Sequence, residues 1–150
     1  MIQIPEGFIE LPFNYGFIGV NGPLYAKRDG GQLRLGLRVE ERHCNPMGIA
    51  HGGMLVTFAD MQLPLASRYQ AGLPDNFLPT INLSVDFLAP ARMGAWVEGE
   101  TQVMRRTKNL VFAQCTVTAD GEPSLRASGI FKIGPAMTSG DASFANLFGR

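Results

Sequence analysis

The stretch Asn45-Pro46-Met47-Gly48-Ile49-Ala50-His51-Gly52-Gly53 decides the fold, because it leads directly into one long apolar run that contains Asp60. Asn before Pro favours a turn, and a polar residue before an apolar periodic run favours a helix start. A helix start presents backbone N–H groups that lack intrahelical acceptors and can bind anions. A carboxylate inside an apolar helix is costly unless it has a task. The stretch therefore predicts an anion-binding helix start with one carboxylate on the same helix.

The apolar run predicts a helix over His51–Ala71, which Gly72 and Pro74 end. Because the segment is apolar on nearly every side, we expect the helix to be buried all round. Pro64 lies inside it and releases the carbonyl of Asp60, so we also expect a kink at that point.

Strands are predicted on both sides of the helix, because apolar and polar residues alternate there with a period of two. Glycine-containing turns separate several of these segments. The predicted strands cover residues 22–28, 33–39, 81–87, 96–105, 110–119 and 125–133. Antiparallel strands around one long apolar helix must curl to cover it. The fold class is therefore α+β, with an antiparallel sheet wrapped around a central helix.

The bulk composition is that of one ordinary globular domain of 150 residues, 45% apolar and 17% charged. Residues 1–22 are expected to form an irregular arm with one short helical turn, and residues 137–150 a loose tail. Thirteen basic and thirteen acidic side chains cancel. This balance gives no footprint for nucleic acid or an anionic membrane, so neither is expected as a partner.

Cellular location and metal binding are also addressed by the sequence. Cys44 and Cys115 have no metal or redox spacing and are interpreted as small apolar residues. Glu6 and Glu10 interrupt any apolar signal sequence, and no run reaches the length of a membrane span, so we expect a cytoplasmic protein.

Each residue of the opening stretch has both a structural and a chemical interpretation. Asn45 either starts a turn or donates its amide to a substrate carbonyl. The pair Gly52-Gly53 either allows tight packing at the helix start or lets the N–H of Gly52 stabilise an oxyanion. His51 is either an ordinary polar residue or a catalytic one. It forms no metal site with His43, because no third ligand has suitable spacing.

Asp60 is the sharpest candidate, either as a general base or as a nucleophile. A hydroxyl nearby would keep it ionised, and Thr80 is a candidate, although threonine is also simply a good strand residue. Gly52 and Asp60 are eight residues apart, which is about 12 Å along a helix. One carbonyl carbon cannot touch both. If they act together, a symmetric dimer must supply one of them, which predicts shared active sites.

The segment Arg105-Arg106-Thr107-Lys108-Asn109 lies between two predicted strands. It is either a solvated hairpin end or a phosphate clamp, with Arg92 as a possible helper.

Taken together, these residues resemble the PaaI-like group of hotdog-fold acyl-CoA thioesterases. The matching motif is Asn45-x-x-Gly48-x-x-His51-Gly52-Gly53, with Asp60 nine residues after the histidine. The segment from Thr80 to Ala91 is similar to the family's third strand. The resemblance covers roughly residues 23–134. It implies a homodimer with a continuous sheet, often paired into tetramers, and hydrolysis of a thioester without a metal or a cofactor other than the CoA of the substrate.

The resemblance also implies the roles of individual residues. Asp60 would activate water or attack the acyl carbon, and the Gly52 N–H with the Asn45 amide would polarise the carbonyl. His51 would orient Asn45 or the substrate, while Thr80 would help position the water. Thr80 replaces a serine that is frequent in relatives, and Pro64 interrupts a helix that relatives usually keep regular. The remaining substrate-binding candidates are the helix-start Gly53, the basic Arg92, Arg105, Arg106 and Lys108, and an apolar pocket of Met54, Phe58, Met61 and Leu65.

Two other functions are compatible with the same fold. A hydratase or dehydratase would act on the acyl chain and not on its carbonyl carbon. An acyl-CoA sensor without catalysis would not need Asp60. The histidine-glycine-glycine start with a mid-helix carboxylate fits hydrolysis better than either.

Overall fold

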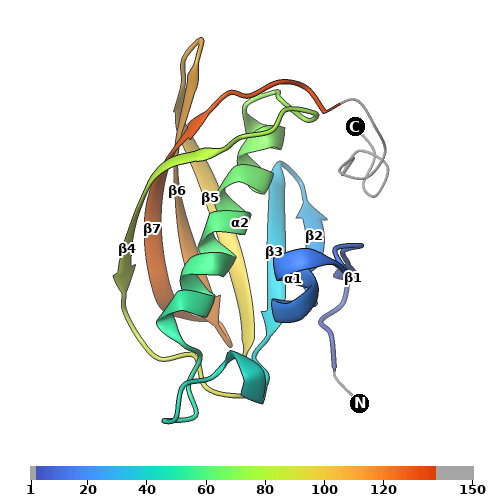
Figure 1. Ribbon diagram of the computed structural model, residues 1–150, viewed down its shortest axis with the longest axis vertical. Helices are drawn as coiled ribbons and strands as arrows, with labels where there is room; N and C mark the ends of the chain where they lie inside the picture. Colours follow the sequence, from blue (N-terminus) through green and yellow to red (C-terminus); the bar gives the residue numbers. More distant parts are fainter. Residues whose placement is uncertain (1–2, 138–150) are drawn as a thin grey trace.

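One antiparallel sheet curls around a long helix in the computed structural model, which describes residues 3–137 (Figure 1). The helix is α2 (Gly52–Gln70), and the strands lie in the order β1-β2-β3-β5-β6-β7-β4. The other elements are β1 (Ile9–Glu10), α1 (Gly16–Asn21), β2 (Tyr25–Asp29), β3 (Gln32–Arg38), the 3-10 turn η1 (Glu41–His43), β4 (Thr80–Phe87), β5 (Trp96–Arg106), β6 (Leu110–Ala119) and β7 (Glu122–Lys132). The α+β class and the central helix predicted from the sequence are confirmed.

The predicted bounds of the helix differ from the observed ones by one residue at each end. His51 is the N-cap and Ala71 the C-cap of α2, and Pro64 lies inside the helix without ending it. The first predicted strand, a short one, begins at Tyr25 instead of residue 22. Pro23 precedes it and has no N–H to donate to a neighbouring strand.

The N-terminal arm is more ordered than predicted. Its strand β1 pairs with β2, with Ile9 opposite Ala26, and α1 follows. Arg42 donates to the carbonyl oxygens of Val20 and Gly22, which holds the end of α1 against η1. A two-residue strand is too short to show an alternating pattern, so the sequence could not indicate it. Apart from its first residue, the predicted tail 137–150 lies outside the described residues.

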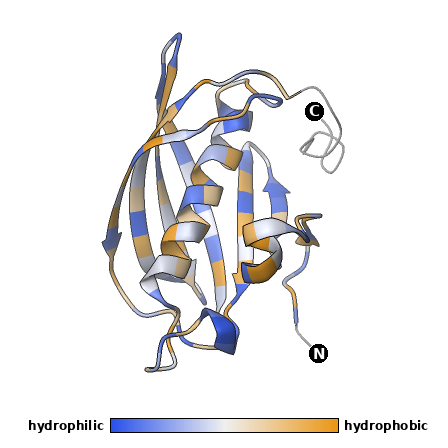
Figure 2. Ribbon diagram, in the orientation of Figure 1, coloured by the Kyte–Doolittle hydropathy of each residue, from blue (hydrophilic) through white to orange (hydrophobic). Residues whose placement is uncertain are grey.

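The core lies between α2 and the concave face of the sheet. Figure 2 shows hydrophilic and hydrophobic residues alternating along the strands, as expected for strands with one buried face. On β6, the buried Val111, Ala113, Cys115 and Val117 alternate with the exposed Gln114 and Thr116. The sheet therefore has an apolar face toward α2 and a polar face on the outside.

The expectation that α2 is buried on every side is wrong for the single chain. The sheet covers one side of the helix only, and Figure 1 shows the near side of α2 free of any strand. Residues at helical spacing of three and four form this open face. They are exposed or half-buried: Gly53, Val56, Thr57, Asp60, Met61 and Pro64. The apolar and small residues on this face leave a surface that a second chain can cover.

Side-chain amides replace part of the main-chain pairing between β3 and β5. These strands pair only from Gly36 to Arg38 and then separate. Gln62 of α2 accepts from Leu35 N at 2.8 Å and donates to Leu33 O at 3.0 Å. A carboxamide presents one donor and one acceptor side by side, as a peptide group does, and buried peptide groups must be paired. Gln62 therefore makes the hydrogen bonds that β5 does not make with this part of β3.

Two further glutamines do the same for β5. Gln32 bonds both the N and the O of Thr101, at 3.2 and 2.8 Å. Gln70 donates to Thr101 O at 2.7 Å and accepts from Val103 N at 2.8 Å. Gly99 makes room for the arrangement, because a Cβ there would lie 2.4 Å from Gln62 Oε1. The backbone N–H and carbonyl groups of the two strands are thus hydrogen-bonded although the strands are apart. This arrangement lets the sheet bend around α2.

Candidate functional site

The loop before α2 uses one side of the Asn45 amide and leaves the other available. Asn45 Oδ1 accepts from Met47 N at 2.9 Å, and Gly48, with a φ of +74°, donates its N–H to Asn45 O at 3.0 Å. The predicted turn is therefore confirmed. The Nδ2 group has no acceptor among residues 3–137. An amide fixed through its oxygen can present its NH₂ to a carbonyl oxygen.

His51 orders the first turn of α2. Its Nδ1 accepts from Gly53 N at 2.8 Å, so the neutral ring carries its proton on Nε2. A Cβ on Gly53 would lie 3.0 Å from Nδ1, which explains why glycine suits this position. The N–H of His51 donates to His43 O at 2.8 Å. His51 thus acts as the helix cap and links the helix to η1.

The N–H of Gly52 is the first-turn donor that α2 leaves without a partner. The N–H of Gly53 bonds the His51 ring, and the N–H groups of Met54 and Leu55 bond His51 O at 2.9 and 3.2 Å. For Gly52, the described residues supply no acceptor. This donor lies at the positive end of the helix dipole. The position predicted for an oxyanion is therefore open to a ligand.

Asp60 and Thr80 are in direct contact. Thr80 Oγ1 donates to Asp60 Oδ1 at 2.6 Å, a length typical of hydrogen bonds to carboxylates. Asp60 is half-buried on the open face of α2, and Thr80 is the first residue of β4. The contact expected from the sequence is thus present. Asp60 keeps its second oxygen for a further partner.

Gly52 and Asp60 remain too far apart to act on one group within a chain. Both lie on α2, which runs unbroken between them, so the separation of about 12 Å holds. The structure therefore contains two candidate half-sites on one helix, one at its start with Gly52 and one in its middle with Asp60.

The basic residues do not form one cluster within the chain. Arg106 donates to Ala71 O and thereby caps the end of α2, while Arg105 and Lys108 are exposed beside the β5–β6 hairpin. Arg92 pairs with Ile49 near the start of α2. A helix of 19 residues is about 28 Å long. Within one chain, Arg92 therefore cannot help the hairpin to hold the same phosphate.

The predicted apolar pocket lies mostly inside the core. Phe58 is 0% exposed, and Met54 and Leu65 are also buried against the sheet. Only Met61 of this group is half-buried on the open side of α2. In the single chain, Met61 is thus the member of the group that a ligand could reach.

Cys115 and His43 are engaged in the structure and are not candidates for chemistry at these half-sites. Burial raises the pKa of Cys115 to about 12, so its thiol stays neutral near pH 7 and is a poor nucleophile. The two ring nitrogens of His43 are occupied, one by Glu40 N at 3.0 Å and the other by Asn21 O at 2.6 Å. Across residues 3–137, no group of three His, Cys, Asp or Glu could hold a metal ion.

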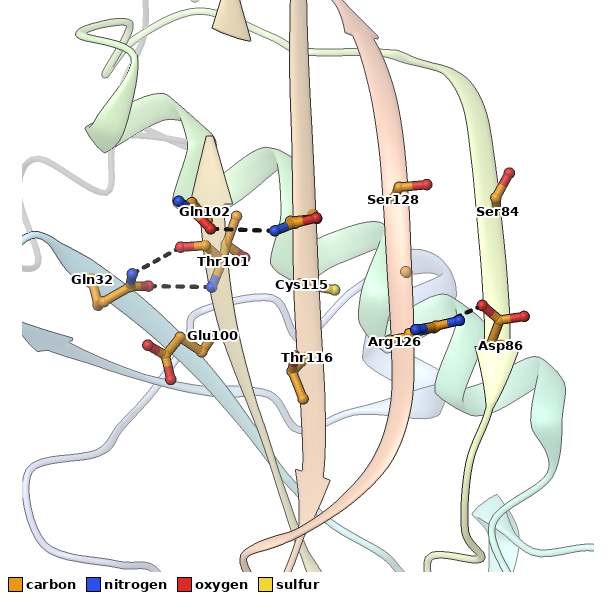
Figure 3. Close-up of a pocket in the computed structure, with 12 residues that line it drawn as sticks. Gln32, Ser84, Asp86, Glu100, Thr101, Gln102, Cys115, Thr116, Arg126 and Ser128 are labelled. Atoms are coloured by element: carbon orange, nitrogen blue, oxygen red, sulfur yellow. Dashed lines mark hydrogen bonds and ion pairs between the residues drawn. The ribbon is translucent and has the colours of Figure 1, made fainter. Parts of the chain in front are cut away.

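A further hollow lies elsewhere, on the polar outer face of the sheet. It has a volume of about 800 Å³ and is lined from β3, β4, β5, β6 and β7 (Figure 3). Its charged groups are paired, for example Arg126 Nε with Asp86 Oδ2 at 2.9 Å. The sheet separates it from α2. We therefore place the candidate site on the α2 side, where the unpaired Gly52 N–H and the Asp60–Thr80 pair lie.

Comparison with known proteins identifies the family of the chain. The model of the thioesterase superfamily matches residues 47–125, which include the start of α2, Asp60 and β4. The chain belongs to the thioesterase superfamily.

The similarity to individual superfamily members extends over most of the chain. A Pseudomonas aeruginosa protein provisionally named an esterase is 34% identical over 134 residues, covering 89% of this chain and 99% of its own. Mouse acyl-coenzyme A thioesterase 13 is 27% identical over 97 residues, covering 62% of this chain and 65% of its own. The Escherichia coli PaaI protein has the same fold, with a TM-score of 0.69, 20% identity and coverage of 81% of this chain and 86% of its own.

This thioesterase-superfamily chain also contains neighbours of the half-sites that sequence reasoning missed. The ring of Phe87 lies against Gly52, and Gln62 holds the strands beside the middle of α2. The sequence shows Phe87 only as one apolar residue in an alternating strand. None of the described helices is long and apolar enough to cross a membrane.

Proposed function

We propose that this protein hydrolyses acyl-CoA thioesters to a free acid and CoA. The observation that carries the proposal is the Asp60–Thr80 hydrogen bond on the open face of α2, in a chain of the thioesterase superfamily. A carboxylate there can serve as the base for a water molecule or as the nucleophile itself. The name of mouse acyl-coenzyme A thioesterase 13 supports CoA esters as the substrate class.

The reaction follows from the groups at the two half-sites. The carbonyl oxygen accepts from the Gly52 N–H and from Asn45 Nδ2, which stabilise the negative charge that develops on it. Asp60 takes a proton from water as the water oxygen bonds to the carbonyl carbon, or attacks that carbon directly. The carbon–sulfur bond then breaks, and the CoA sulfur leaves and takes up a proton, which on the water route is the one that Asp60 accepted. On the direct route, water then cleaves the anhydride between the acyl group and Asp60, which releases the free acid and restores the carboxylate. The hydrogen bond from Thr80 fixes the position of the Asp60 side chain, and His51 keeps the helix start in place.

A homodimer formed through β4 would bring the half-sites together. β4 is the last strand of the sheet and pairs with β7 on one side only. Its first residue, Thr80, contacts Asp60, and its last, Phe87, contacts Gly52. Antiparallel pairing of β4 with its copy, with Thr80 opposite the partner's Phe87, sets each Asp60 across from the partner's Gly52. The exposed Ile81 on this unpaired edge also favours a partner strand.

The experiment that tests the proposed function is thiol release from a panel of acyl-CoAs by the purified protein. We expect turnover of at least one linear or aromatic acyl-CoA, with one free acid formed for each thiol. Binding of acyl-CoA without release of thiol would favour a sensor. Consumption of an enoyl-CoA double bond without thiol release would favour a hydratase. Either result would overturn the hydrolase proposal.

We propose Arg105 and Lys108 as contacts for the phosphates of CoA. Replacing both by glutamine should raise KM for CoA esters by at least about tenfold, because the loss of even one hydrogen bond to a charged group costs about 1.5–3 kcal/mol. The same variant should hydrolyse N-acetylcysteamine thioesters, which carry no phosphate, at the original rate. Arg106→Gln is the matched control, since Arg106 caps α2. It should lower Tm without distinguishing the two substrates. An equal rise in KM for both substrates would contradict the phosphate contact.

A further inference from the structure

Phe87 supplies the atoms nearest to the open side of Gly52. A Cβ on Gly52 would lie 3.1 Å from Cζ, 3.3 Å from Cε1 and 3.9 Å from Cε2 of this ring. The ring therefore fills the space that a side chain at position 52 would take. Phe87 is nevertheless 57% exposed, so the ring is packed on one side and open on the other.

The ring of Phe87 and the unpaired N–H donor meet at the same residue, Gly52. The N–H of Gly52 and the position of its absent Cβ are two bonds apart, on the same residue. A carbonyl oxygen that accepts from this N–H at about 2.9 Å brings its neighbouring carbon atoms within reach of the ring. Burial of the exposed ring surface against such carbons is favourable, because apolar area leaves water.

We infer that Phe87 selects the acyl group by packing against its α-carbon, the carbon next to the carbonyl. This inference rests on the proposed function. An acyl chain with a CH₂ at the α-carbon fits beside the ring, and this class includes linear and arylacetyl groups. A methyl branch or an aromatic ring attached directly at the carbonyl would collide with Phe87. Val85 and Leu83 lie on the same face of β4 and are half-buried, so they extend the apolar surface for a linear chain.

The test compares two isomeric substrates, butanoyl-CoA and 2-methylpropanoyl-CoA, which differ only in branching at the α-carbon. The protein should prefer the linear isomer. Phe87→Ala should raise the ratio of kcat/KM for the branched over the linear ester by at least about tenfold, in line with the effect of one methylene in an apolar pocket. Met104→Ala is the control, because Met104 is equally exposed but lies beside the hairpin at the far end of α2. This variant should leave the ratio unchanged.

Several outcomes would overturn the inference. If the original protein hydrolyses acyl-CoAs but the ratio is unchanged in Phe87→Ala, Phe87 does not select the acyl group. An equal loss on both isomers, with Tm and molecular mass maintained, would likewise assign Phe87 to general packing. If the alanine variant unfolds, the same ratio is measured in Phe87→Leu, which keeps an apolar side chain on β4. Absence of hydrolysis of either isomer, and of every other acyl-CoA, by the original protein would overturn the proposed function and this inference with it.

Discussion

Asp60→Asn is expected to lower kcat for thioester hydrolysis by at least about 10². The amide keeps the shape of the carboxylate and can still accept from Thr80 Oγ1, but it can neither take a proton from water nor attack a carbonyl carbon. Because Asp60 is half-buried on the open face of α2, the exchange should change Tm little. Thiol release at saturating acyl-CoA measures the effect.

Asp86→Asn is the matched control for this prediction. Asp86 lies on β4, the strand that begins with Thr80. Its carboxylate is exposed on the outer face of the sheet and is paired with Arg126. Surface ion pairs of this kind contribute little to stability. Asp86→Asn should therefore keep kcat within about twofold of the original value. Full activity in Asp60→Asn would reject the catalytic role of Asp60.

Mixing two inactive variants should restore activity if the half-sites are shared between subunits. Asn45→Asp keeps the oxygen that Met47 N requires but loses the amide donor, and Asp60→Asn loses the carboxylate. In an equal mixture, half of the dimers are mixed, and each of these has one complete site. The expected activity is thus about a quarter of the original, far above either variant alone. Thiol release is measured after the two variants have been unfolded, mixed and refolded together.

A control mixture of Asp60→Asn with the double variant Asn45→Asp/Asp60→Asn should stay inactive, because no pairing of these subunits contains an Asp60 carboxylate. Native mass spectrometry must detect mixed dimers in both cases. Mixed dimers of the two single variants that show no activity would contradict the shared site, since two residues acting within one chain cannot be complemented.

The fold could be predicted largely from local patterns. The bounds of α2 followed from His51-Gly52-Gly53 at its start and from Gly72 after its end, which are signals that lie within a few residues of the helix. The contact between Asp60 and Thr80 was also anticipated. A lone carboxylate in an apolar helix requires a polar partner, and Thr80 opens the next strand.

Contacts between distant segments were not visible in the sequence. Arg106 lies in a run of basic residues, and nothing in that run shows that its partner is the end of α2. Phe87 and Gly52 are 35 positions apart, and their contact depends on how β4 crosses the start of the helix. The open face of α2 was missed because an apolar helix has the same pattern whether one chain or two cover it.

The three glutamines between β3 and β5 make the shape of this sheet depend on single side chains. Main-chain pairing persists through almost any substitution, because every residue except proline carries the same N–H and carbonyl groups. An amide at position 32, 62 or 70 is lost when that one residue changes. Substitution at any of these three positions can therefore change the angle at which β3 and β5 separate. Because Gln62 is two residues from Asp60 on α2, a change of this angle could shift the Asp60 carboxylate without altering any of the candidate site residues.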